Sequence, residues 1–207
     1  MAFASPSQNI PDSELRELSR QIGSLLPGLP VHKKYETVGI GESFAIYEVK
    51  AKQFNSTPPT LPAIPTGYWH YQVFLDRDPL AYAVVYGSGG KLNIYEIAVS
   101  AVAERIHKAI ERVDRYDKGD TPVRFLVVPS CLVYAFFLVD SGEVYVIDAP
   151  PLPTRVPEGG HLIPDMILSK EKFLDGLRVL HSALTGESES REKGRKGSSK
   201  GGRTDKS

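Results

Sequence analysis

The alternation of apolar and polar positions predicts a β-sheet in the middle of the chain. Residues 69–75 and 80–86 are rich in aromatic and β-branched side chains, and residues 76–79 between them have the composition of a turn. We therefore predict a β-hairpin. A glycine-rich turn at residues 87–90 and a third strand that begins at Leu92 follow it.

A helical period replaces the strand pattern directly after this third strand. Apolar residues recur at spacings of four, four, three and four, in the order Ala98, Val102, Ile106, Ala109 and Val113. This spacing places them on one face of a helix, and the opposite face carries Glu104, Arg105, Lys108, Glu111 and Arg112. We predict one long amphipathic helix from about Ser100 to Tyr116.

Three further strands are predicted at residues 123–128, 132–139 and 144–147. Residues 132–139 are all apolar and show no alternation, which indicates a strand covered on both faces. The loops between these segments are short, so we expect antiparallel neighbours. The fold class that follows is α+β, with a mainly antiparallel sheet of about five to seven strands and the long helix packed on one face.

The flanking segments predict a single domain with appendages. Short helices are expected near Asp12 and from about Ser169, and a strand is expected at residues 44–49. The expected domain covers residues 12–184, and its core lies at residues 67–149. Proline-rich connectors span residues 57–66 and 149–164, and the segments 1–11 and 185–207 are predicted to be disordered.

The charged residues do not alter the predicted fold. Lysine plus arginine and aspartate plus glutamate both total 25, so nucleic acid is an expected partner only through the basic tail. The longest apolar run has eight residues, far fewer than the roughly 20 of a membrane helix. We expect a soluble cytoplasmic protein with no membrane partner. The single cysteine, Cys131, fits a reducing compartment.

Conventional catalytic chemistry has weak support in this sequence. The five histidines lack the spacing of a zinc site, so neither a metal nor a cofactor is expected. Cys131 and His70 allow a cysteine–histidine pair, with Asp148 as a third member, but no hydrolase motif surrounds them. An enzyme built from these dispersed residues is one alternative, and a nucleic-acid accessory protein that uses its basic tail is another.

The aromatic hairpin is the main candidate binding surface. Its residues are Tyr68, Trp69, His70, Tyr71, Tyr82 and Tyr86. Tyrosine and tryptophan provide contact area at low conformational cost, so an uncovered face would bind a protein or a small ligand. Ordinary cross-strand packing is the competing interpretation. On this basis we predict a non-catalytic interaction or ligand-binding module.

A second candidate lies in the proline-rich exit from the sheet. Pro150, Pro153 and Arg155 fit the Pro-x-x-Pro-x-Arg pattern of peptides that bind SH3 domains. Such hexamers also arise in any proline-rich connector, so a plain linker is the alternative.

Overall fold

The strand β2 (Val38–Glu48) joins two half-sheets because it changes partner along its length. Its residues Val38 to Ala45 pair antiparallel with β3 (Tyr68–Leu75). Its residues Ile46 to Glu48 pair parallel with β6 (Pro122–Val128). The computed structural model describes residues 2–3, 10–28, 34–88, 91–116, 122–151 and 162–197.

The described residues form one nine-stranded sheet. The remaining strands are β1 (Ala2–Phe3), β4 (Asp78–Ser88), β5 (Lys91–Val99), β7 (Val133–Leu138), β8 (Glu143–Asp148) and β9 (Ile167–Ser169). The strand order is β5-β4-β3-β2-β6-β7-β8-β9, and β1 pairs parallel with the start of β6. Apart from β1–β6 and β2–β6, these pairs are antiparallel. We call β5-β4-β3-β2 the first half-sheet and β6-β7-β8-β9 the second.

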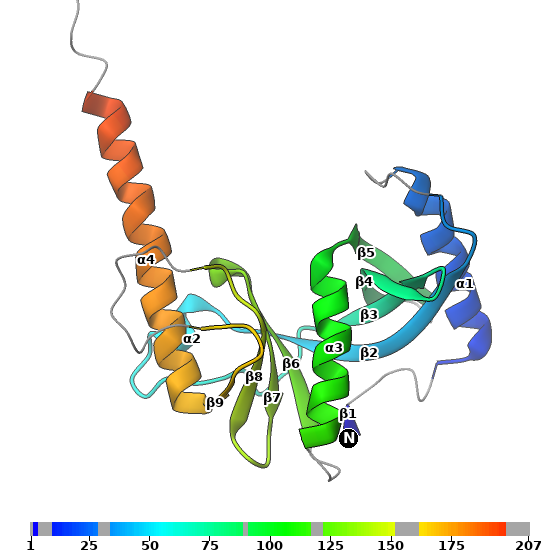
Figure 1. Cartoon of the computed structure of the whole chain (residues 1–207), viewed down its shortest axis with the longest axis horizontal. Coiled ribbons are helices and arrows are strands. Elements are labelled where there is room, and N and C mark those ends of the chain that lie inside the picture. Colours follow the sequence, from blue (N-terminus) through cyan, green and yellow to red (C-terminus); the bar gives the residue numbers. More distant parts are fainter. Residues whose placement is uncertain are drawn as a thin grey trace, which may run out of the picture.

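Helices cover both faces of this sheet (Figure 1). They are α1 (Asp12–Leu25), α2 (Ala51–Phe54), α3 (Ala101–Tyr116) and α4 (Lys170–Gly197), with short 3-10 turns η2 (Leu26–Gly28) and η3 (Pro129–Cys131). α3 crosses in front of the junction of the two half-sheets, while α1 and α4 lie on the outer sides. We call the face that α3 covers the α3 face.

Strand alternation explains how the two faces are filled. On β7, Ala135 and Phe137 pack with α4, whereas Phe136 and Leu138 pack with α3. This two-sided burial is what the apolar run 132–139 predicts. On β3, the residues Tyr71, Val73 and Leu75 point to the opposite side from α3 and pack with Leu18 and Ile22 of α1. The described core therefore consists of three apolar clusters, one beneath each of α1, α3 and α4.

The expected architecture matches the structure only roughly. The sheet has more strands than the five to seven predicted, and α4, with 28 residues, is longer than α3, with 16. The amphipathic helix and the first hairpin lie where the pattern places them. The parallel β2–β6 pairing was not predicted, because a parallel contact between distant segments leaves no local signature.

The strand β2 begins earlier than the strand predicted at residues 44–49. It starts at Val38 and runs through Gly39 and Gly41, residues that are unfavourable inside a strand. A register shift between Ile40 and Ser43 absorbs the irregularity, which is a common role of glycine inside a strand.

The ends of the chain can be compared with the prediction only in part. Within residues 1–11, the structure describes Ala2–Phe3 as β1, together with residues 10 and 11. At the other end, α4 continues to Gly197, so its backbone enters the segment predicted as a disordered tail. Residues 198–207 lie outside the described part of the chain.

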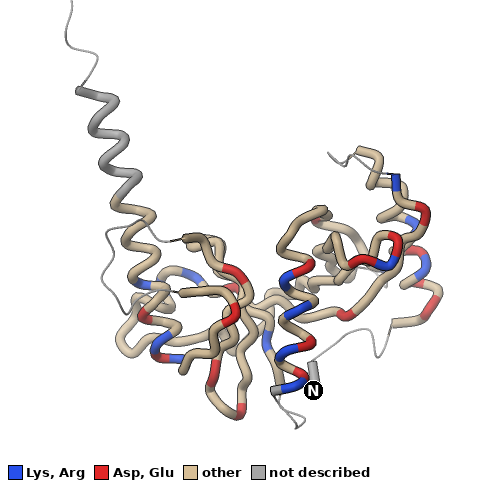
Figure 2. Tube along the Cα trace, viewed as in Figure 1, with Lys and Arg blue, Asp and Glu red and all other residues tan. Residues whose placement is uncertain are grey.

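Charges of both signs alternate along the outer sides of α1 and α3 (Figure 2). Several are paired within one helix, as Lys108 is with Glu104 at 2.6 Å and Arg20 with Glu17 at 2.7 Å. Exposed pairs of this kind contribute little to stability, because water and salt screen the charges. Of the helices in the described residues, none is long and apolar enough to cross a membrane.

Candidate functional site

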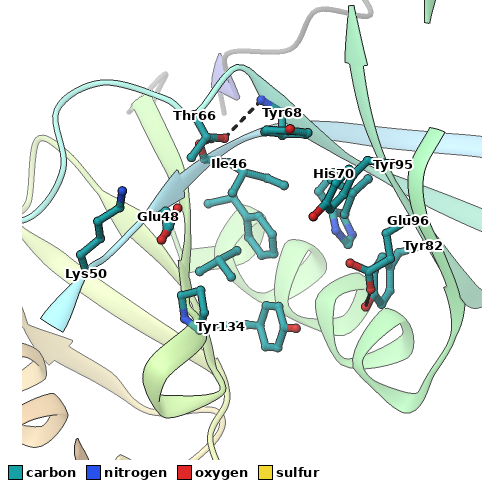
Figure 3. A pocket seen from close by; sticks show the side chains of 14 residues that line it. Ile46, Glu48, Lys50, Thr66, Tyr68, His70, Tyr82, Tyr95, Glu96 and Tyr134 are labelled. Atoms are coloured by element: carbon teal, nitrogen blue, oxygen red, sulfur yellow. Dashed lines mark hydrogen bonds between the residues drawn. The ribbon is translucent and has the colours of Figure 1, made fainter. Parts of the chain in front are cut away.

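A pocket of about 530 Å³ lies on the α3 face, between the two half-sheets. Its walls come from β2, β3, β4 and β5 on one side and from β6, η3 and β7 on the other. Six of its lining residues carry aromatic rings: Tyr68, His70, Tyr82, Tyr95, Phe125 and Tyr134. We call this site the aromatic pocket (Figure 3).

The strand register places the first wall. Tyr68 and His70 are two residues apart on β3 and therefore point to the same face. Val84, the partner of His70 on β4, faces the pocket with it, and Glu96 on β5 is in turn the partner of Val84.

A β-bulge on β5 adds one more side chain to this wall. Val84 pairs with Glu96 but Val85 pairs with Ile94, so Tyr95 is an extra residue on β5. A regular strand would turn two successive side chains to opposite faces. Here both Tyr95 and Glu96 line the pocket. Re-aiming of a side chain is a typical consequence of a bulge, and bulges are common beside functional sites.

His70 is the most buried polar residue in the pocket wall, with 3% of its surface exposed. Its ring stacks on Tyr82 at a centroid distance of 5.1 Å and lies 5.0 Å from the ring of Phe125. Burial lowers the pKa of His70 to about 3, so the imidazole is neutral at physiological pH. Its Nε2 atom has no hydrogen-bond partner among the described residues.

Tyrosine hydroxyls line the pocket from both half-sheets. The Tyr82 hydroxyl donates to Glu96 Oε1 at 2.8 Å, and Tyr134 of β7 points toward both residues (Figure 3). Burial raises the pKa of Tyr82, and the hydrogen bond to Glu96 raises it further. Burial also raises the pKa of Tyr134. Both hydroxyls therefore keep their protons at neutral pH.

The ionised groups of the pocket are mainly acidic. Glu48 and Glu96 contribute two carboxylates, and Lys50 contributes one ammonium group. Lys50 is exposed and lies at the end of the pocket away from His70 (Figure 3). Near Tyr134, Asp148 forms an ion pair with Arg105 of α3.

The structure divides the six predicted hairpin residues between two environments. Tyr68, His70 and Tyr82 line the aromatic pocket. Trp69 and Tyr71 lie on the other face and pack in the cluster beneath α1, where Tyr71 is fully buried. Tyr86 is 37% exposed and contacts the ring of Tyr68 outside the pocket lining.

Several pocket residues were missed from sequence. Glu48, Tyr95, Glu96 and Tyr134 lie outside the predicted hairpin, and the structure brings them to it. The period of two could have placed Glu48 beside Ile46 on one face of β2. No sequence signal could have revealed the bulge at Tyr95.

The alternative built on Cys131 and His70 is not supported by their positions. Cys131 is buried in the cluster beneath α4, where its Sγ lies 3.8 Å from the carbonyl oxygen of Leu177. His70 lies on the α3 face, so the sheet separates the two residues. Burial also raises the pKa of the Cys131 thiol, which opposes formation of a nucleophilic thiolate.

The remaining candidates fall mostly outside the part of the chain that can be compared. Pro150 is half-buried after β8, whereas Pro153 and Arg155 of the SH3-type hexamer lie outside the described residues. Within the described residues, no group of three or more histidine, cysteine, aspartate or glutamate side chains could hold a metal ion.

Comparison with known proteins adds no functional assignment. No protein-family model matches this chain, and no curated protein sequence matches it. The geometry and chemistry of the aromatic pocket therefore provide the basis for a functional proposal.

Proposed function

We propose that this protein is a ligand-binding module that holds a small molecule in the aromatic pocket. The pocket volume of about 530 Å³ falls within the range of roughly 300–1,000 Å³ that is typical of small-molecule sites. Its composition is also typical, because six of its 14 lining residues carry aromatic rings and a few polar groups converge on it.

The observation that carries this proposal is the environment of His70. A buried polar atom without a hydrogen bond costs about 1–3 kcal/mol. Nε2 of His70 is such an atom in the pocket wall, and a bound molecule that reaches it through a small movement of the side chains covering it would recover part of that free energy. The stacked rings of Tyr82 and Phe125 fix the imidazole plane, so the site is already organised before a ligand arrives.

The displaced pKa values favour binding over acid–base catalysis. A general acid or base works best when its pKa lies near the operating pH. Burial moves the pKa of His70 away from neutral pH, to about 3. It also raises the pKa values of Tyr82 and Tyr134 above that of free tyrosine. At neutral pH these three groups therefore act as fixed hydrogen-bonding groups and do not exchange protons with a substrate.

The test is a ligand screen against the wild-type protein and a variant with a filled pocket. Val127→Phe enlarges a partly buried side chain that lines the pocket. We expect ligands detected by NMR with the wild-type protein to bind this variant at least about tenfold more weakly, because the added ring occupies their volume. The matched control is Ile64→Phe, at a residue that is 80% exposed and outside the pocket lining.

Folding of both variants is checked by circular dichroism and thermal unfolding. If Val127→Phe does not fold, the smaller substitution Val84→Ile at the opposite wall of the pocket serves instead. The proposal is overturned if the bound ligands bind the filled-pocket variant and the control equally well, or if the wild-type protein retains no ligand from a chemically broad set.

A further inference from the structure

We propose that the ligand of the aromatic pocket is a small organic cation, with an alkylated ammonium group as its charged end. This inference rests on the proposed function and specifies its ligand class. It follows from the combination of ring faces, carboxylates and a neutral histidine in one cavity.

The aromatic rings that line the pocket can attract a cation. Tyr68 and Tyr95 meet edge to face, with ring centroids 5.1 Å apart, at one side of the pocket. Tyr82 and Tyr134 lie at the other side of the same cavity (Figure 3). The face of an aromatic ring carries partial negative charge and attracts a cation, and tyrosine-rich cages are a recurrent solution for alkylated ammonium groups.

The charged side chains that line the pocket also favour a cation. Two carboxylates, Glu48 and Glu96, and one ammonium group, Lys50, line the pocket, which leaves a net formal charge of −1. The carboxylate of Glu96 is held in place by the hydrogen bond from Tyr82. Glu96 is exposed, so its attraction for a cation is modest and sensitive to salt, and the aromatic rings around it add to that attraction.

The neutral state of His70 completes the charge balance. A protonated imidazole in the wall would repel a cation, but burial keeps this ring uncharged at physiological pH. The nearby Arg105 is already engaged by Asp148. An anionic ligand would instead face two carboxylates, with only the exposed Lys50 to pair with it among the lining residues.

The experiment compares choline with its uncharged isostere, in which a quaternary carbon replaces the nitrogen. The two molecules have the same shape, so a difference in affinity reports the charge alone. We expect choline to bind at least about tenfold more tightly by calorimetry or NMR titration. The preference should shrink at high ionic strength, because salt screens the carboxylates.

Two variants locate the charge recognition. Glu96→Gln keeps an oxygen that can accept from Tyr82 but removes the negative charge, so choline affinity should fall by about fivefold or more while the isostere is unaffected. The matched control Glu104→Gln changes an acid on α3 that does not line the pocket and should leave both affinities unchanged.

The outcomes separate this inference from the proposed function. The proposal of a cationic ligand is overturned if choline and its isostere bind equally well, or if only neutral aromatic molecules bind. If that binding is weakened by Val127→Phe, the pocket remains a binding site. Absence of any ligand sensitive to Val127→Phe overturns the proposed function and this inference together.

Discussion

At the scale of single residues, His70 shows how burial determines chemistry. The same imidazole on a solvated strand would titrate near neutral pH. His70 lies between the rings of Tyr82, Phe44 and Phe125. Its pKa falls to about 3 there, because transfer of a charged imidazole into this site is unfavourable. The residue therefore links the free energy of unfolding to pH.

The variant His70→Phe tests this linkage. Because the pKa of His70 falls from 6.5 to about 3 on folding, the unfolded chain binds the extra proton, and stability is lost as pH drops below 6.5. Between pH 6.5 and about 3, the free energy of unfolding of the wild-type protein should fall by about 1.4 kcal/mol per pH unit more than that of His70→Phe. Urea unfolding measures both.

The two proteins share all their carboxylates, so those contributions cancel in the difference. Above pH 6.5 the variant should be as stable as the wild-type protein or more so, because a ring without polar atoms replaces the unpartnered Nε2. Parallel curves of stability against pH for the two proteins would contradict the assignment of His70 as a neutral buried residue.

At the scale of elements, β2 depends on a close approach between strands. A Cβ atom added at Gly41 would collide with the ring of Phe74 on β3, whereas one added at Gly39 would meet Phe74 Cβ at an ordinary 3.5 Å. Phe74 in turn packs edge to face on His107 of α3, with centroids 5.6 Å apart. The absence of a side chain at Gly41 thus lets β2, β3 and α3 pack together.

We expect Gly41→Ala to lower the free energy of unfolding by about 1–3 kcal/mol, because the ring of Phe74 must move. Gly39→Ala on the same strand is the matched control and should be neutral or slightly stabilising. Chemical denaturation measures both.

The double variant Gly41→Ala/Phe74→Leu provides a further check, since a smaller side chain at residue 74 should recover part of the loss. If Gly41→Ala proves as stable as Gly39→Ala, the close approach does not limit the packing of β2 against β3.

At the scale of the whole molecule, the packed body ends within α4. The last buried side chain among the described residues is Leu180, and Leu184 still contacts the cluster beneath α4. Residues 187–207 contain no aliphatic or aromatic side chain in the sequence. Their contribution to the core is therefore expected to be negligible, although α4 extends to Gly197.

Deletion of residues 187–207 should change the free energy of unfolding by less than about 0.5 kcal/mol. Leu177→Ala, at a fully buried position of α4, is the contrasting variant and should cost about 2–5 kcal/mol. Urea unfolding compares the two, and a truncated protein as unstable as Leu177→Ala would show that the tail supports the fold. A nucleic-acid affinity lost with the same deletion would support the alternative role of the basic tail.

Much of the architecture could be predicted from sequence, because strands and helices each have a characteristic spacing of apolar residues. The spacing of Ile106, Ala109 and Val113 identified the face of α3 that is buried. The unbroken apolar run of β7 identified a strand covered on both faces. The extent of β2 and the short strand β9 were not accessible, because glycine and proline signals there pointed to loops.

The candidate site was accessible only in part. Tyr68, His70 and Tyr82 were identified because aromatic residues concentrate on one hairpin. Trp69 and Tyr71 were placed with them, although alternation along β3 turns these two toward α1. Glu48 and Tyr134 could not be connected to the hairpin, because the β2–β3 and β2–β6 pairings that bring them to it join segments far apart in the sequence.

The amino-acid sequence was enough to predict most of the central strands and the long helix α3, because these elements depend on neighbours a few residues away. The tertiary structure alone decided which face stays partly open. That choice depends on the parallel contact of Ile46 with Phe125 and on where α3 lies across the junction. Contacts between such distant segments are set by packing of the whole core, and they turn an aromatic hairpin into one wall of a pocket.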